Sequence, residues 1–190
     1  DAILAHGDCV NPPAFEVASL PIKPNAENGA PEPSECLVNA GRKPDEDGYT
    51  PFARNTTSYG GAFRLNNFFY SHGLGQQAFS RQCFDVSPVC NLFHAQIGLD
   101  DMSPGTFTEF RVFADDVLIY TSPEMDASSE TITLDIPVPA GAKTITLESG
   151  PDTNKSIVYA DWVNARMTCP ASSWPTPALN KNTFLPMGGR

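Results

Sequence analysis

Three aspartates are the residues of this chain best suited to hold a metal ion. Asp100 and Asp101 follow directly after a segment of alternating apolar and polar residues, and Asp161 lies within the run Tyr-Ala-Asp-Trp. Carboxylate oxygens are hard ligands of the kind that Ca2+ takes from loops of extracellular domains. These residues therefore predict a structural calcium ion, with the alternative that Asp100 and Asp101 cap a turn by accepting backbone N–H groups.

A second group of side chains has the chemistry of sugar recognition. A sugar site needs a flat aromatic face for the apolar side of a pyranose, and planar polar groups for its hydroxyls. Trp162 offers the first, and Gln76 and Gln77 in a glycine-rich segment offer the second. We predict that these three residues contact carbohydrate, although a tryptophan among β-branched neighbours is more often a core residue.

Catalytic chemistry finds little support in the sequence. The chain has three histidines and no Gly-x-Ser-x-Gly segment, the elbow that presents a nucleophilic serine in many hydrolases. Glycoside hydrolysis needs two carboxylates roughly 5–10 Å apart across a cleft. No such pair stands out among the acidic residues, most of which we expect to be solvated. We predict no catalytic residue, and a glycosidase remains the third interpretation.

Five cysteines without a Cys-x-x-Cys pair indicate disulfides rather than structural zinc. Cys83 and Cys90 are close enough in sequence to pair across a short hairpin, and Cys9 and Cys36 would pin the N-terminal segment. The odd count leaves one cysteine over. This usage predicts an oxidising, extracellular location.

Two sequons, at Asn55 and Asn154, are candidate glycosylation sites of a secreted glycoprotein. The formal net charge of −10 repels nucleic-acid phosphates and anionic lipid. No apolar run approaches the roughly 20 residues of a membrane span. We therefore expect neither nucleic acid nor membrane insertion.

The 190 residues divide into three parts. Residues 1–50 and 170–190 are proline-rich and predict an extended N-terminal arm, with one edge strand near residues 15–20, and an extended C-terminal tail. Residues 51–169 are expected to form the folded domain. Two long termini of this kind suggest self-association, since an extended arm can add a strand to a neighbouring sheet.

The sequence of residues 51–169 predicts β-strands and shows no helical periodicity. Apolar side chains alternate with polar ones over residues 93–99, 131–136 and 142–148, and Asp115-Asp116 lies between two apolar runs as in a hairpin turn. Strands that recur every ten or so residues predict an all-β fold, an antiparallel β-sandwich or jelly roll.

Four segments, taken in order, resemble the NPCBM family of carbohydrate-binding modules over about residues 60–168. They are Gly73-Leu-Gly-Gln-Gln-Ala-Phe-Ser80, Ile97-Gly-Leu-Asp-Asp101, Phe110-Arg-Val-Phe-Ala-Asp115 with the run that follows it, and Ala160-Asp-Trp-Val-Asn-Ala-Arg166. Where the family usually has histidine, this chain has Gln77. The resemblance implies a β-sandwich attached to secreted glycosidases or surface proteins, with calcium and galactose-type sugars as ligands.

The residues and the resemblance together predict a non-catalytic extracellular carbohydrate-binding module. Because sugars offer little apolar area, each site would bind weakly and tight attachment would need several sites. The alternative is a structural subunit of an extracellular fibre, coat or matrix, assembled through the extended termini.

Overall fold

The computed structural model describes residues 52–78, 80–86, 88–104, 107–150 and 158–170, together with the backbone of residues 14–16 and 37–38. Every regular element in this part of the chain is a β-strand, and every strand pair is antiparallel. The all-β class expected from the sequence is therefore confirmed. Nothing among the described residues is a helix long and apolar enough to cross a membrane.

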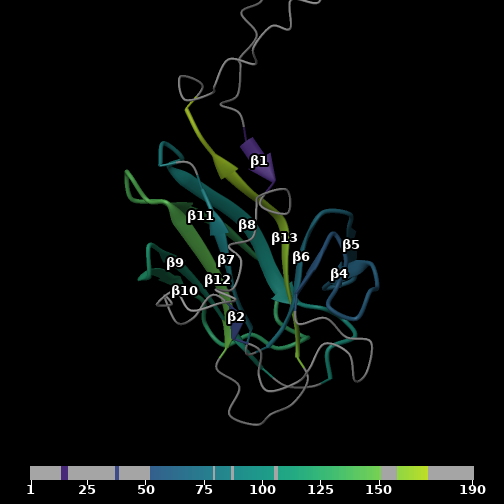
Figure 1. The fold of residues 1–190 in the computed structure, drawn as a ribbon. Helices are drawn as coiled ribbons and strands as arrows, with labels where there is room; N and C mark the ends of the chain where they lie inside the picture. The colour runs from purple at the N-terminus through teal and green to yellow at the C-terminus, as the bar shows by residue number, and fades with distance from the viewer. Residues whose placement is uncertain are drawn as a thin grey trace, which may run out of the picture.

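Two sheets form the body of the molecule (Figure 1). The six-stranded sheet runs in the order β11 (Ile132–Pro137), β8 (Leu92–Leu99), β13 (Tyr159–Thr168), β6 (Gly73–Gln77) and β3 (Phe52–Arg54), with β1 (Ala14–Glu16) also paired to β13. The five-stranded sheet runs in the order β10 (Val117–Thr121), β9 (Glu109–Ala114), β12 (Thr144–Gly150), β7 (Ser80–Asp85) and β2 (Leu37–Val38).

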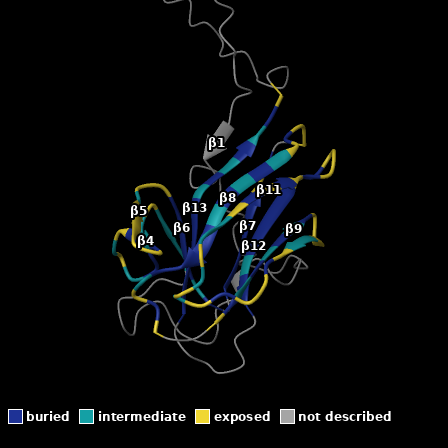
Figure 2. Ribbon diagram, turned by 180° about the vertical axis from the view of Figure 1, so that it is seen from behind, coloured by how far each residue is buried: buried dark blue, intermediate teal, exposed yellow. Residues whose placement is uncertain are grey.

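The hydrophobic core lies between the sheets and follows the alternation of the sequence. Phe93, Ala95 and Ile97 of β8 point inward and are fully buried, and the intervening side chains are partly exposed. Trp162 lies at the centre, with ring centroids 5.1 Å from Phe110 and 6.2 Å from Phe93. Figure 2 shows the same pattern as buried segments along β7, β8 and β12.

A separate hairpin, β4 (Phe63–Leu65) and β5 (Phe68–Tyr70), stands apart from both sheets beside β6 and β13 in Figures 1 and 2. Phe63 and Leu65 are buried with Val163 of β13 in a small second cluster. The hairpin is thus attached to the sheet by its own apolar contacts.

Glycine is required at position 75 because another segment crosses directly over β6. A Cβ atom at Gly75 would lie 2.5 Å from the Thr56 carbonyl oxygen and 2.6 Å from the Ser58 nitrogen. Real Cβ atoms do not approach backbone atoms this closely, so the packing requires the second glycine of the Gly-Leu-Gly segment. It allows residues 56–58 to lie flat against the sheet.

The disulfide prediction for Cys83 and Cys90 is wrong. Cys90 bonds to Cys169, because Leu92 pairs with Thr168 and brings the start of β8 beside the end of β13. Cys83 lies on β7 and is disulfide-bonded as well. Cys9 and Cys36 lie outside the described residues.

Most of the proposed arm and tail also lies outside the described residues, so the division at residues 50 and 170 stays a prediction. The edge strand expected near residues 15–20 is found at Ala14–Glu16, paired with β13.

Candidate functional site

Gln76 and Trp162, predicted to contact sugar, instead bond to each other inside the core. Trp162 Nε1 donates to Gln76 Oε1 at 2.9 Å, and Gln76 Nε2 donates to the Leu147 carbonyl oxygen at 3.2 Å. Neither Gln76 nor Trp162 has any exposed surface. Because no ligand can reach them, the prediction of sugar contact is wrong for both residues. They form a buried polar bridge between the two sheets.

Gln77, the last residue of β6, is partly exposed. Its role in sugar binding stays a prediction.

Asp100 is a buried turn cap at the end of β8. Its Oδ1 accepts hydrogen bonds from Tyr59 Oη at 2.8 Å and Met102 N at 2.9 Å, and its Oδ2 accepts one from Arg64 N at 3.0 Å. Turn capping was the alternative to calcium binding in the sequence analysis, and the structure shows Asp100 in this capping role. Burial, and then the hydrogen bond to Asp100, raise the pKa of the Tyr59 hydroxyl.

Asp161 is a buried carboxyl group without a conventional partner. Neither of its oxygens accepts a hydrogen bond from any described residue. Burial first, and then the neighbouring negative charge of Asp100, raise the pKa of Asp161 well above its usual value. A protonated Asp161 can donate to Asp100, which satisfies both groups, whereas two carboxylates would repel each other. The raised pKa of Asp161 therefore favours its protonated, uncharged form.

Asp101 faces the hairpin instead of Asp161. Asp101 Oδ2 accepts a hydrogen bond from Asn67 N at 3.0 Å and lies 3.0 Å from Arg64 Nε. Asp101 N in turn donates to the Arg64 carbonyl oxygen at 2.7 Å. Asp100 and Asp101 thus fasten the β4–β5 hairpin to the end of β8.

These positions fit calcium poorly. Ca2+ takes six to eight oxygen ligands, but both carboxylate oxygens of Asp100 and Oδ2 of Asp101 already accept protein hydrogen bonds. The described residues hold no group of three or more His, Cys, Asp or Glu able to bind a metal ion. Calcium at Asp100, Asp101 and Asp161 stays a prediction.

Asn55 is exposed, and its Oδ1 accepts a hydrogen bond from Gly73 N at 3.1 Å. Asn154 lies outside the described residues. Glycosylation at both sequons stays a prediction.

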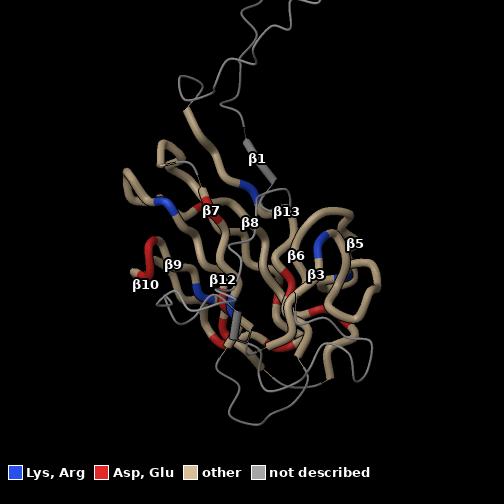
Figure 3. The backbone as a smooth tube through the Cα atoms, viewed as in Figure 1, with Lys and Arg blue, Asp and Glu red and all other residues tan. Residues whose placement is uncertain are grey.

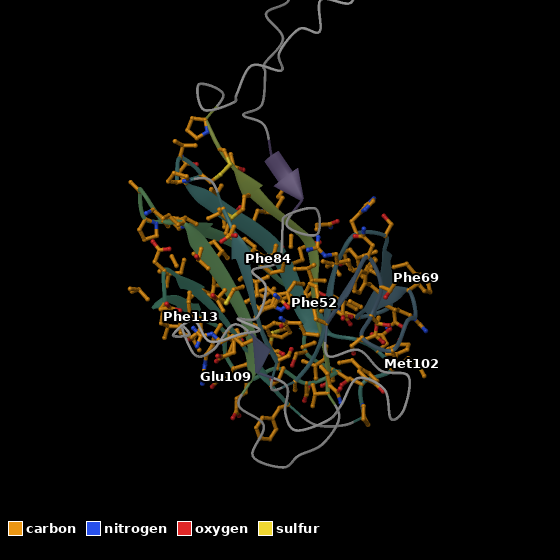
Figure 4. All side chains as sticks on the ribbon, in the orientation of Figure 1. Phe52, Phe69, Phe84, Met102, Glu109 and Phe113 are labelled. Atoms are coloured by element: carbon orange, nitrogen blue, oxygen red, sulfur yellow. A yellow bond between two sulfur atoms is a disulfide. The ribbon has the colours of Figure 1, made fainter. Side chains whose placement is uncertain are left out.

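The sequence analysis missed the surface that the hairpin presents. Phe68 and Phe69 are 68% and 72% exposed, and Met102 beyond the end of β8 is 67% exposed. Figure 4 shows Phe69 and Met102 on the same side of the molecule, away from Phe84 and Phe113. The signal was present in the sequence, since two asparagines between the apolar residues Leu65 and Phe68 are typical of a two-residue hairpin turn.

The described strands define a small antiparallel β-sandwich with an appended hairpin. The chain belongs to the NPCBM/NEW2 domain family, whose match covers residues 37–168. A Renibacterium salmoninarum protein named "Putative endo-alpha-N-acetylgalactosaminidase" is 33% identical over 120 residues, which is 61% of this chain and 8% of that protein. The chain therefore spans a small fraction of this relative's length.

Solved structures share the fold. The CBM51-2 and INT domains of Clostridium perfringens ZmpB, in complex with GlcNAc, align at a TM-score of 0.63 with 16% identity over 84% of this chain and 32% of that chain. The CBM51 of Clostridium perfringens GH95, in complex with methyl-galactose, aligns at a TM-score of 0.60 with 18% identity over 82% of this chain and 100% of that chain. At these identities the likeness concerns the fold.

Proposed function

We propose that this chain binds carbohydrate without transforming it, as the sugar-directed module of a secreted protein that acts on glycans. The observation that carries the proposal is the NPCBM/NEW2 family match, which extends over most of the sandwich. The named relative is called a glycosidase, and the chain covers only 8% of it.

The ligand complexes of the structural neighbours suggest which sugars to test first. One neighbour holds GlcNAc and another holds methyl-galactose, both of them uncharged pyranoses. A neutral sugar also suits a chain of net charge −10, which disfavours anionic ligands at long range. An extracellular location accords with the Cys90–Cys169 disulfide.

The described residues support binding in preference to turnover. His94 is paired with Asp135, with Nδ1 2.7 Å from Oδ1, on the outer face of the six-stranded sheet. Glu109 and Glu148 are both engaged with Arg111, at 2.7 and 3.3 Å. These histidine, aspartate, glutamate and arginine side chains contact one another along the strands, as is common for polar residues on the exposed face of a sheet.

Equilibrium titration of the full chain with methyl galactoside, GlcNAc and their oligosaccharides tests the proposal. We expect saturable, weak binding, in the range of about 0.1–1 mM for one shallow site, and no release of free sugar from the same oligosaccharides. Size-exclusion chromatography of the same sample addresses the structural-subunit alternative. A concentration-dependent polymer that binds none of the sugars would contradict the proposal.

A further inference from the structure

The tip of the β4–β5 hairpin has a regular turn and is held by hydrogen bonds from the end of β8. Asn66 and Asn67 have φ values of 48° and 69°, and Leu65 pairs directly with Phe68, so the turn is a two-residue turn of the type that matches strand twist. Three hydrogen bonds from the end of β8 hold this hairpin, at Arg64 N, the Arg64 carbonyl and Asn67 N.

Phe68 and Phe69 do not hold the hairpin in place. The small cluster that attaches it consists of Phe63, Leu65 and Val163, with Tyr70 packed against it. The two phenylalanines are 68% and 72% exposed. Exposed aromatic side chains at the tip of a hairpin that is anchored by other residues are more consistent with contact to a ligand than with folding.

Arg64 lies beside the Phe69 ring in a fixed orientation. Its Cζ is 5.5 Å from the ring centroid, Nη2 donates to Asn67 Oδ1 at 2.8 Å, and Nε lies 3.0 Å from Asp101 Oδ2. Arg64 Nη1 makes no hydrogen bond to any described residue. Figure 3 shows a basic segment beside β5, distant from the acidic turn between β9 and β10.

These groups complement a sugar ring. An aromatic face accepts the C–H side of a pyranose, and Arg64 Nη1 and the Asn67 side-chain N–H are donors for its hydroxyl oxygens. The Asp101 carboxylate is an acceptor at the same edge. Because Arg64 and Asp101 neutralise each other at 3.0 Å, the tip carries no net charge toward an acidic ligand. Little rearrangement is needed on binding, since the network already exists.

We infer that the tip of the β4–β5 hairpin, with Phe69 as the stacking surface and Arg64, Asn67 and Asp101 as the polar rim, is the site that binds a terminal uncharged pyranose; Phe68 lies on the opposite face of the hairpin, where Leu65 is its cross-strand partner. This inference rests on the proposed function and names the site that performs it. The occupant is carbohydrate rather than a neighbouring protein module because donors, an acceptor and an aromatic face lie together on an electrically balanced edge.

The double variant Phe68→Ala/Phe69→Ala tests the site. We expect its affinity for methyl galactoside or GlcNAc, whichever the wild-type chain binds, to fall by about tenfold or more, the usual consequence of removing an anchor residue. The matched control is Val117→Ala/Leu118→Ala. These two residues are 63% and 51% exposed and follow another two-residue turn with positive φ, at Asp115 and Asp116. We expect the control to keep wild-type affinity.

A measurement on the unmodified chain guards against misfolded variants. In a sugar titration followed by NMR, the side-chain amide of Asn67 is expected to shift, while that of Asn164, which donates to Gln96 on the outer sheet face, stays constant. Sialylated versions of the same sugars are expected not to bind measurably, because the chain carries a formal net charge of −10.

The outcomes separate this inference from the proposed function. Wild-type affinity in Phe68→Ala/Phe69→Ala, with a constant Asn67 signal, would overturn the site and leave sugar binding standing. Absence of binding by the wild-type chain to every neutral glycan would overturn the function and the site together.

Discussion

Trp162 donates its indole N–H to Gln76 Oε1 across 2.9 Å, and both residues are fully buried. This bond joins β13 to β6, and the second bond of Gln76 reaches Leu147 on the opposite sheet. Two residues whose types suit sugar binding thus stabilise the interior, and the ligand surface must be sought elsewhere.

Trp162→Phe should therefore lower stability and spare binding. The change leaves Gln76 Oε1 buried without a donor and opens a small cavity, which together cost about 3 kcal/mol. Chemical denaturation measures the loss, with Val117→Ala as an exposed control. A folded Trp162→Phe protein with normal stability but weakened sugar affinity would restore Trp162 as a ligand contact.

Asp161→Asn should change how stability depends on pH. The folded state raises the pKa of Asp161 above its ordinary value of 3.8, so the folded protein holds this proton more tightly than the unfolded chain does. The wild-type protein therefore loses stability as pH rises from about 4 toward neutrality, until the folded-state pKa is passed. The asparagine amide replaces the protonated acid as a donor to Asp100, so the variant should lack this loss.

Thermal unfolding of both proteins between about pH 4 and pH 8, in chelator, measures this difference. We expect Asp161→Asn to be the more stable protein at neutral pH and the gap to close in acid. The same series with added Ca2+ tests the calcium prediction. Strong stabilisation of the wild-type chain by Ca2+, lost in Asp161→Asn, would show that the pair holds a cation instead of a proton.

Removal of the Cys90–Cys169 disulfide should destabilise the domain substantially. The bond closes a loop across a sequence separation of 79 residues, and the chain-entropy estimate for such a loop is roughly 4.5 kcal/mol. The double variant Cys90→Ser/Cys169→Ser, compared with wild type by thermal unfolding, measures this loss. A Cys83–Cys90 peptide in a non-reduced digest would contradict the pairing.

Gly75→Ala should be among the most damaging small substitutions. The added methyl group would meet the backbone of residues 56–58, which cannot move without lifting from β6. Overpacking of this kind costs about 1–3 kcal/mol. Gly141→Ala is a useful comparison, because a Cβ there meets nothing within 4 Å, although its φ of 89° adds strain of its own. Equal stability of Gly75→Ala and wild type would refute the close approach.

The sequence was sufficient for the fold because the strand signals are local. Strict alternation over residues 93–99 and 131–136 puts Ile97 and Leu134 inside, and the structure confirms both. The Asp115-Asp116 turn was also predictable, since both residues adopt the positive φ that such a hairpin requires.

The site was less predictable because it depends on tertiary contacts. The sequence around Trp162 does not distinguish a core tryptophan from an exposed sugar-binding one. Its contacts with Phe93 and Phe110, which come from other strands, identify it as a core residue. Cys90 finds Cys169 through the pairing of β8 with β13, a non-local relationship. The aromatic tip was overlooked for the opposite reason, since phenylalanine is usually assigned to the core.

The most direct test of the whole account is a glycan array probed with the wild-type chain and with Phe68→Ala/Phe69→Ala side by side. Signal from the wild-type chain on glycans that end in neutral galactose or GlcNAc, absent from the variant and from sialylated caps, is the predicted pattern. Identical signals from the two proteins, or wild-type signal confined to acidic glycans, would contradict it.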